Sequence, residues 1–352
     1  KRDGVYVNGI KIKFKGVNRH SFRPETGRTM SYANSLEDVQ LIKSMNMNAV
    51  RMSHYPPDGH FLDVCDSLGL FVIDELTGWQ GNYDTPTGSR LVKELVEHDR
   101  NHPSIVIWAN GNEGGHNTDL DTLFKDYDPQ QRPVIHPWQL FSDIQTQHYR
   151  EYNYGIGNDG GHGAGLEDYW EKMWHNPLSA GGFLWDFADN AVMRHDLNDS
   201  LDTDKFRAAD GILGPHLEKE GSYYAIKEIW SPVYFERREI TPLFDGKLNL
   251  ENRYHFTNIN TCRFNWKLQR FEIRDTRMQT GTAPAPDIQP GAKGVLDLML
   301  PVDWYDYDVL YVTANDKDQR ELFTWSFPIS SPARTGARMI VKEGNAEIRH
   351  PM

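Results

Sequence analysis

Short strand-like segments alternate with segments of helical periodicity over residues 14–230. In the first unit a strand-like run at residues 14–17 precedes a helical pattern, and Ser35 with Asp38 three residues later is typical of a helix N-terminus. Repeated strand-then-helix units predict a parallel sheet covered by helices. The expected strands are residues 14–17, 49–52, 70–75, 105–108, 134–135, 144–148 and 181–186.

These strands are one fewer than a TIM (β/α)8 barrel has, and this α/β barrel is the fold class that we expect for residues 14–230. The missing helix and strand belong between His148 and Leu166. A crossover between parallel strands needs about 10–12 residues, so residues 149–150 alone cannot join the segment 144–148 to a following barrel strand. Either residues are missing from the sequence at this point or the seventh unit is degenerate, and the first alternative is preferred.

The remaining segments have no helical pattern. Residues 231–331 alternate apolar and polar positions between turn signals, which predicts an all-β, immunoglobulin-like sandwich. Residues 1–13 read as a hairpin with its turn at Asn8-Gly9, leading in from a preceding domain, and residues 332–352 as a linker and the start of a further β domain. We therefore expect the sequence to be an internal part of a longer polypeptide.

Composition and charge exclude several classes of function. A formal charge of −12 repels polyanions, so nucleic acid is not an expected partner, and the apolar runs are too short to cross a membrane. Cys65 and Cys262 are too few and too far apart for a disulfide framework. Aromatic residues make up 12% of the chain, which suits either stacking on sugar rings or an ordinary core.

Polar side chains follow four of the predicted strands. Because catalytic groups of a TIM barrel lie at the carboxyl ends of its strands, we expect these side chains to converge on one mouth. A single carboxylate in such a place is as often a helix cap or an ion-pair partner. The segments are residues 18–20, 51–56, 74–75 and 110–113.

Residues 101–113, which end in Asn112-Glu113, resemble the acid/base signature of glycoside hydrolase family 2. Four further segments resemble successive strands of the large bacterial β-galactosidases of that family, and the resemblance covers residues 1 to about 330. It implies a barrel followed by an immunoglobulin-like domain, and a retaining, exo-acting hydrolase that releases terminal β-linked galactose from oligo- or polysaccharides. The further segments are residues 14–20, 49–56, 70–75 and 181–186.

Retaining hydrolysis needs two carboxylates about 5–5.5 Å apart. The resemblance implies that Glu113 is the acid/base and that Glu151, in a Glu-Tyr pair before a glycine-rich turn, is the nucleophile. A floor of Trp108 and Trp185 would bury Glu113 and raise its pKa, as a proton donor requires. The strand that Glu151 should end is not evident, so an exposed loop glutamate remains the alternative.

Supporting roles also come from the resemblance. Glu75 is read as structural, and a buried histidine that holds a turn is as good a reading of His54 as direct contact with sugar. The predicted substrate-binding residues are Asn112, which would bond the sugar 2-hydroxyl, Arg51 near the nucleophile, Tyr149 on the nucleophile, and His20, His54, His148 and Trp185 around the sugar.

The family's metal-binding carboxylate is not found after His20, where Ser21, Phe22 and Arg23 stand instead. We therefore expect no magnesium site and no cofactor. Arg23 suggests a different glycone or an anionic substrate. The Asn-any-Lys element of glucuronide-specific members occurs only at residues 265–267 and 315–317, in the predicted sandwich, so galactose is preferred.

Three functions stay open. The first is a β-galactosidase, the second a β-glucuronidase or another glycosidase of the family, and the third an inactive carbohydrate-binding or structural protein without a working seventh strand. The expected partner is a carbohydrate, and assembly into a homo-oligomer is left open. The sequence sets no compartment, although a periplasmic or secreted location is preferred for a bacterial protein of this kind.

Overall fold

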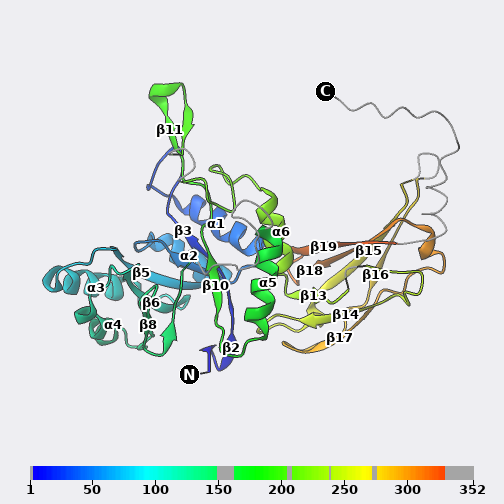
Figure 1. Cartoon of the computed structure of the whole chain (residues 1–352), viewed down its shortest axis with the longest axis horizontal. Coiled ribbons are helices and arrows are strands. Elements are labelled where there is room, and N and C mark those ends of the chain that lie inside the picture. The colour runs from blue at the N-terminus through cyan, green and yellow to red at the C-terminus, as the bar shows by residue number, and fades with distance from the viewer. Residues whose placement is uncertain (1–2, 149–161, 204–207, 238, 272–275, 330–352) are drawn as a thin grey trace. The chain divides into compact units, whose positions relative to one another are not determined.

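The computed structural model describes residues 3–148, 162–203, 208–237, 239–271 and 276–329 (Figure 1). Two compact units are present, Lys1–Ser231 and Pro232–Met352. The predicted site residues Tyr149 and Glu151 and the predicted linker at 332–352 lie outside the described residues.

The first unit contains a six-stranded parallel sheet. Helices follow its strands along the chain, and the described residues form the half-barrel sheet of an α/β barrel, as predicted. Across the sheet the order is β10 (Gly181–Leu184), β3 (Phe14–Arg19), β4 (Ala49–Met52), β5 (Phe71–Trp79), β6 (Ile105–Asn112) and β7 (Val134–Ile135). The helices are α1 (Tyr32–Ser44), α2 (Gly59–Leu68), α3 (Thr85–Asp99), α4 (Asp121–Tyr127), α5 (His162–His175) and α6 (Gly221–Ile229).

Two short antiparallel pairs accompany this sheet. β1 (Val5–Val7) and β2 (Ile10–Ile12) form the hairpin at the start of the chain, turning at Asn8 and Gly9, which both have positive φ. β11 (Val192–Arg194) and β12 (Ser200–Asp202) form a second pair (Figure 1). No helix in the described part of the chain is long and apolar enough to span a bilayer.

The prediction of a barrel strand at residues 144–148 is wrong. β8 (Leu140–Phe141) and β9 (Ile144–Gln145) pair with each other, antiparallel and apart from the main sheet. Their two connecting residues, Ser142 and Asp143, have φ of 50° and 63°. Positive φ at both central positions suits a two-residue hairpin turn, so the chain reverses here.

Helix α1 begins one turn earlier than predicted. Ser31 is its N-cap: the Ser31 hydroxyl accepts a hydrogen bond from the Asn34 backbone N–H at 3.2 Å, and Asn34 Oδ1 accepts one from the Ser31 N–H at 3.0 Å. This reciprocal capping satisfies the free N–H groups of the first turn, which leaves Ser35 buried inside the helix. Asp38 is also inside the helix, where it pairs with Arg19 of β3 and with Arg23 in the loop after β3.

The two faces of the parallel sheet bury different apolar sets. Phe14, Ile73, Ile107 and Ile135 cluster on one face, and the alternate positions pack with the helices on the other. Strands buried on both faces are typical of parallel sheets under helices. Trp108 belongs to the helix-covered face, where its Nε1 donates to Asp128 Oδ2 at 3.0 Å.

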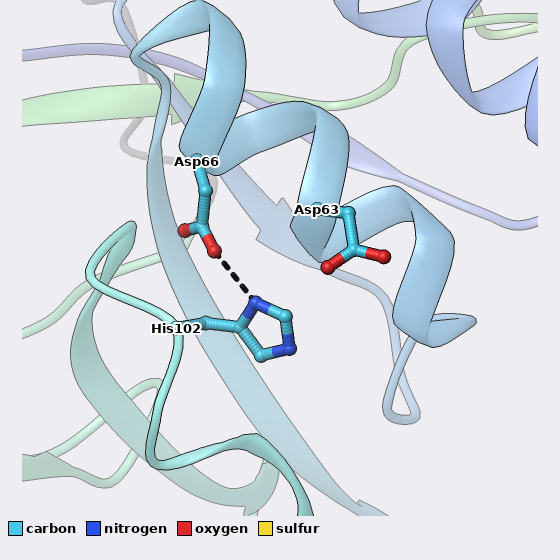
Figure 2. Close-up of side chains that lie close together, drawn as sticks. All are labelled: Asp63, Asp66 and His102. Atoms are coloured by element: carbon cyan, nitrogen blue, oxygen red, sulfur yellow. Dashed lines mark hydrogen bonds and ion pairs between the residues drawn. The ribbon is translucent and has the colours of Figure 1, made fainter.

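A carboxylate of α2 holds the loop that leads into β6. Asp66 Oδ2 lies 2.7 Å from His102 Nδ1 (Figure 2). Asp66 Oδ1 accepts a hydrogen bond from the Ser104 N–H at 2.9 Å. Asp63, one turn earlier on α2, completes a group whose possible metal-ligand atoms lie within 4.8 Å of one another. Since both oxygens of Asp66 are already hydrogen-bonded, we interpret the group as a clamp that fixes the start of β6.

The second unit is antiparallel throughout its named strands. Alternate positions of β18 are buried, as expected where two sheets enclose a core, and buried residues of both sheets form one apolar cluster. One sheet contains β13 (Val233–Phe235), β14 (Lys247–Asn252) and β17 (Lys293–Asp297). The other contains β16 (Met278–Ala283), β15 (Arg263–Gln269), β18 (Val309–Asn315) and β19 (Glu321–Pro328). The predicted succession of a parallel α/β sheet and antiparallel sheets is confirmed.

Candidate active site

A cavity of about 600 Å³ opens at the carboxyl ends of the parallel strands. Its walls contain polar side chains from the ends of four strands and apolar side chains from the sheet face beneath them. Because parallel strands deliver their carboxyl ends to one side, residues far apart in sequence meet here. The polar lining includes Asn18, Arg51, His54, Asn112, Glu113, His148, Trp185 and Asp210.

Glu113 is the first residue after β6 and is hydrogen-bonded by the side chains of Trp79, His148 and Gln80. Trp79 Nε1 donates to Oε2 at 2.9 Å, and His148 Nδ1 lies 3.1 Å from Oε1. Burial alone would raise the pKa of Glu113, but the hydrogen bonds of Trp79 and His148 stabilise the carboxylate and hold its pKa below the ordinary value. Trp108 is buried among the helices and does not line the cavity, so the expected desolvated floor of Trp108, and the raised pKa, are wrong.

Glycines bring the end of β5 against the loop after β6. A Cβ on Gly78 would lie 2.2 Å from the carbonyl oxygen of Gly115, and a Cβ on Gly115 would lie 2.5 Å from the carbonyl carbon of Gly78. The two backbones therefore approach as closely as only glycine allows. This contact places Trp79 within reach of Glu113.

Arg51 connects three strands beneath the cavity. Its guanidinium donates to Asn18 Oδ1 at 3.1 Å and to Asn112 Oδ1 at 2.7 Å, and it forms a buried ion pair with Glu75. With its oxygen bound to Arg51, the amide of Asn112 presents its NH2 group as the donor for a ligand. A fixed cation at this place also favours ionised carboxylates in the cavity.

Glu75 is fully buried and does not line the cavity. Besides Arg51 it binds His54, whose Nδ1 lies 2.8 Å from Glu75 Oε1. His54 stacks on Trp185 with ring centroids 5.3 Å apart, and Trp185 Nε1 donates to Asp210 Oδ2 at 2.8 Å. Glu75 thus orients the histidine and arginine at the cavity wall.

His20 lies behind this wall rather than in it. Its ring meets His54 and Trp185 edge-on, at centroid distances of 5.8 and 5.4 Å, and its Nδ1 lies 3.2 Å from the Tyr55 hydroxyl. Burial, followed by the positive charge of His54 and Arg28, lowers the pKa of His20 to about 4. A neutral His20 therefore supports the aromatic wall.

The loop after β3 does not suit a divalent cation. Arg19 and Arg23 both bind the buried carboxylate of Asp38, and Arg19 also donates to Ser21 Oγ at 3.0 Å. The oxygens of Asp38 and Ser21 are already held by guanidinium groups, whose positive charge would repel Mg²⁺, so these residues do not fit the metal. Arg23 is committed to Asp38 and does not line the cavity, which leaves its expected role in binding an anionic substrate without support.

Several contacts of the site were not predicted. Asn18 and Asp210 bond to predicted residues, and Trp79 and Trp138 flank the histidine and glutamate pair, Trp138 stacking on His148 with centroids 6.0 Å apart. Trp79 could have been suspected because it ends an apolar strand. Asn18 lies in β3, within the segment 18–20 that the sequence already placed at the mouth, whereas Asp210 and Trp138 lie outside the named strands in segments without a recognisable sequence pattern.

Comparison with known proteins gives a consistent result. Residues 1–90 and 80–146 match the model of glycosyl hydrolases family 2, TIM barrel domain. A β-galactosidase of Halalkalibacterium halodurans is 34% identical over 362 residues, covering 85% of this chain and 34% of the relative. A β-galactosidase of Pectobacterium atrosepticum is 27% identical over 360 residues, covering 84% and 33%. The chain spans about a third of the length of these curated relatives.

Solved structures support the fold. A β-glucuronidase of Bifidobacterium dentium, complexed with coumarin-3-O-glucuronide, aligns with a TM-score of 0.50 at 22% identity and covers 65% of this chain and 48% of its own. A family 2 member of Bacteroides cellulosilyticus aligns with a TM-score of 0.51 at 17% identity, covering 94% and 48%. At these identities the likeness concerns the fold alone.

Proposed function

Since the chain contains a TIM barrel domain of glycosyl hydrolases family 2 and is a distant homologue of bacterial β-galactosidases over most of its length, we propose that it releases terminal β-linked galactose with retention of configuration. The observation that carries the proposal is the setting of Glu113. This carboxylate is fixed from both sides at the rim of a cavity whose wall presents Asn112, Arg51 and Trp185.

In the proposed reaction the galactosyl ring occupies the cavity and Glu113 transfers its proton to the glycosidic oxygen. A second carboxylate attacks the anomeric carbon, and Glu113 then takes a proton from the water that releases the sugar. Asn112 would donate to the 2-hydroxyl, and the stacked pair of His54 and Trp185 would face the sugar ring. Glu151 is our candidate nucleophile, although it lies outside the described residues.

The lowered pKa of Glu113 suits the second half of this cycle, in which the residue must be ionised. In the first half the residue must be protonated, and a substrate that displaces His148 from Oε1 would remove one donor and raise the pKa. The proposal therefore predicts that kcat/KM, which reports the free enzyme, declines as pH rises above the acidic range.

Galactose is preferred to glucuronate because, among the described residues, Arg51 is the only lysine or arginine that lines the cavity, and it already pairs with Glu75. A panel of nitrophenyl glycosides, assayed on the full-length protein, tests the proposal. The β-galactoside should be hydrolysed fastest, with β-galactose as the first product by NMR. If the β-glucuronide is hydrolysed faster than the β-galactoside, the preferred sugar is glucuronate and not galactose. If α-galactose is the first product, the enzyme does not retain configuration. If no glycoside is hydrolysed, a carbohydrate-binding role is favoured.

The nucleophile has its own test. A 2-deoxy-2-fluoro-β-galactoside with a good leaving group should form a stable adduct, because the fluorine slows release of the glycosyl-enzyme most. Peptide mapping should place the sugar on Glu151. Labelling of another residue would reject Glu151 while leaving the rest of the proposal standing.

A further inference from the structure

One wall of the cavity is a hairpin that does not belong to the main sheet. Its strands β8 and β9 contain two residues each and pair with each other. The segment from Ile144 to His148 lines the cavity, and His148 reaches Glu113. Because an isolated hairpin is marginally stable in water, the contacts at the base of this hairpin decide where His148 lies.

The base of the hairpin is fastened to His136. Thr146 Oγ1 donates to the carbonyl oxygen of His136 at 2.8 Å, and the Gln139 N–H donates to the same oxygen at 2.9 Å. Across the base, the Thr146 N–H donates to the carbonyl oxygen of Gln139 at 3.2 Å. Since His148 follows Thr146 by two residues, a displacement of His136 would be carried to His148.

The ring of His136 is buried and is fixed in turn to β6, the strand that precedes Glu113. His136 Nε2 lies 2.7 Å from Asp121 Oδ1, and the side-chain NH2 of Asn110 donates to the same oxygen at 2.8 Å. Asn110 and His136 are each the first residue beyond the pairs that join β6 to β7. One carboxylate at the start of α4 thus ties the ends of two neighbouring strands together.

Ring stacking adds a second link to the loop that begins with Glu113. The ring of His116, three residues after Glu113, stacks on His136 with centroids 4.4 Å apart, and Phe141 of β8 stacks on His136 with centroids 3.8 Å apart. Burial, followed by the charge of His136, lowers the pKa of His116, and a neutral ring stacks without repulsion. The three rings join the loop after β6, the end of β7 and the hairpin.

We infer that His136 is a positioning residue, which holds the hairpin so that His148 stays bonded to Glu113. It acts through Asp121 on one side and Thr146 on the other. The consequence for catalysis rests on the proposed function, whereas the positioning itself does not.

The pKa of Glu113 reports whether His148 is in place. The bond from His148 is one of the interactions that lower this pKa, so its loss should raise the pKa. The donors Trp79 and Gln80, and the charges of Arg51 and Glu75 that act on His148, stay the same in every variant below.

Two measurements on the full-length protein follow this pKa. The first is the falling limb of kcat/KM with pH, which should move to higher pH when the pKa of Glu113 rises. The second is the pH dependence of carbodiimide labelling of Glu113, read by peptide mass spectrometry, which needs no catalysis. His148→Ala removes the bond directly and gives the reference shift.

The link through Thr146 has a matched pair of variants. Thr146→Val removes the hydroxyl that bonds His136 and should shift the pKa of Glu113 in the same direction as His148→Ala. Thr146→Ser keeps the hydroxyl and should keep the wild-type pKa. A purely structural loss would not depend on this one hydroxyl.

The ring of His136 is tested in the same way. His136→Phe keeps a ring and removes the N–H that faces Asp121, and Phe141→Ala removes one ring of the stack. Both should raise the pKa of Glu113. Leu140→Ala changes the neighbouring side chain, which is 69% exposed, and should leave the pKa unchanged.

Double variants decide whether these residues act through His148. Added to His148→Ala, neither Thr146→Val nor His136→Phe should shift the pKa further, because the bond on which they act is already gone. Single variants that leave the pKa at its wild-type value, or shifts that are equal with and without His148, would overturn the inference. If the labelling shifts as expected while no glycoside is hydrolysed, the positioning stands and the proposed function fails.

Discussion

At the scale of single residues, the site depends on which donors reach Glu113. Trp79 and His148 each bond to one carboxylate oxygen, and together with a hydrogen bond from Gln80 they outweigh the burial that would otherwise raise the pKa of Glu113. Hydrogen bonds to a carboxylate favour its charged form. The indole of Trp79, on the neighbouring strand, is therefore one of the groups that set the protonation state of Glu113.

Trp79→Phe keeps a ring and removes this N–H. The pKa of Glu113 should rise, so the falling limb of kcat/KM with pH should move to higher pH. The pH profile of an activated aryl glycoside measures the position of that limb. A limb that stays in place, or moves to lower pH, would mean that Trp79 does not donate to Glu113 in solution.

Gly78 is the residue that makes this hydrogen bond reachable. Gly78→Ala puts a methyl group against the Gly115 carbonyl and should separate the two loops, costing about 1–3 kcal/mol of stability and lowering kcat/KM at least tenfold. Gly81→Ala is the matched control, because a Cβ at Gly81 meets nothing within 4 Å. Thermal unfolding and kinetics of both variants measure the difference. Equal behaviour of the two would contradict the close approach.

At the scale of elements, the ends of β3, β4, β5, β6 and β10 supply the site, and their positions could be predicted from sequence. Apolar runs separated by helical patterns mark the strands, and the parallel arrangement then brings Arg51, Asn112 and Glu113 together. The contacts of Trp138 could not be predicted, because a pairing between loops leaves no periodicity. The hairpin at residues 140–145 was missed because its positive φ angles fall on Ser142 and Asp143 rather than on glycine.

Asp186, two residues beyond β10, should make the barrel unit sensitive to pH. Burial, followed by the negative charge of Asp210, raises the pKa of Asp186 to about 8 from its ordinary value of 3.8. A carboxyl whose pKa is raised on folding stabilises the fold fully below its unfolded pKa, and this stabilisation is lost as pH rises through the folded pKa. The loss should therefore fall between about pH 4 and pH 8.

Asp186→Asn keeps the size of the side chain and cannot ionise. Wild type should lose stability as pH rises from 5 to 9, and the variant should not. The free energy of unfolding of the variant minus that of wild type should therefore increase by at least about 1 kcal/mol from pH 5 to pH 9. Chemical unfolding of both proteins at the two pH values measures this difference. If the difference between the two proteins is the same at pH 5 and pH 9, Asp186 ionises in the folded protein as it does in the unfolded chain.

At the scale of the whole molecule, the chain is acidic, with a formal charge of −12. The candidate acid/base Glu113 and most of the described residues predicted to bind substrate line one cavity of the barrel unit. Ser21 and Arg23 stand where the family resemblance of the sequence implies a metal-binding carboxylate. Arg19 donates to the Ser21 hydroxyl, and Asp38 pairs with Arg23. Dialysis against EDTA should leave activity within about twofold of the untreated protein. A large loss restored by Mg²⁺ would show that other residues hold a metal.

The most direct test of the central claim, that Glu113 is the acid/base, is azide rescue of Glu113→Ala. The variant should lose about 10²–10⁴-fold in kcat/KM on lactose, which needs protonation of its leaving group, and far less on an activated aryl galactoside, which does not. Added azide should restore turnover of the aryl galactoside and yield β-galactosyl azide, because no carboxylate remains to repel the anion from the glycosyl-enzyme. Equal losses on both substrates, with no azide product, would contradict the account.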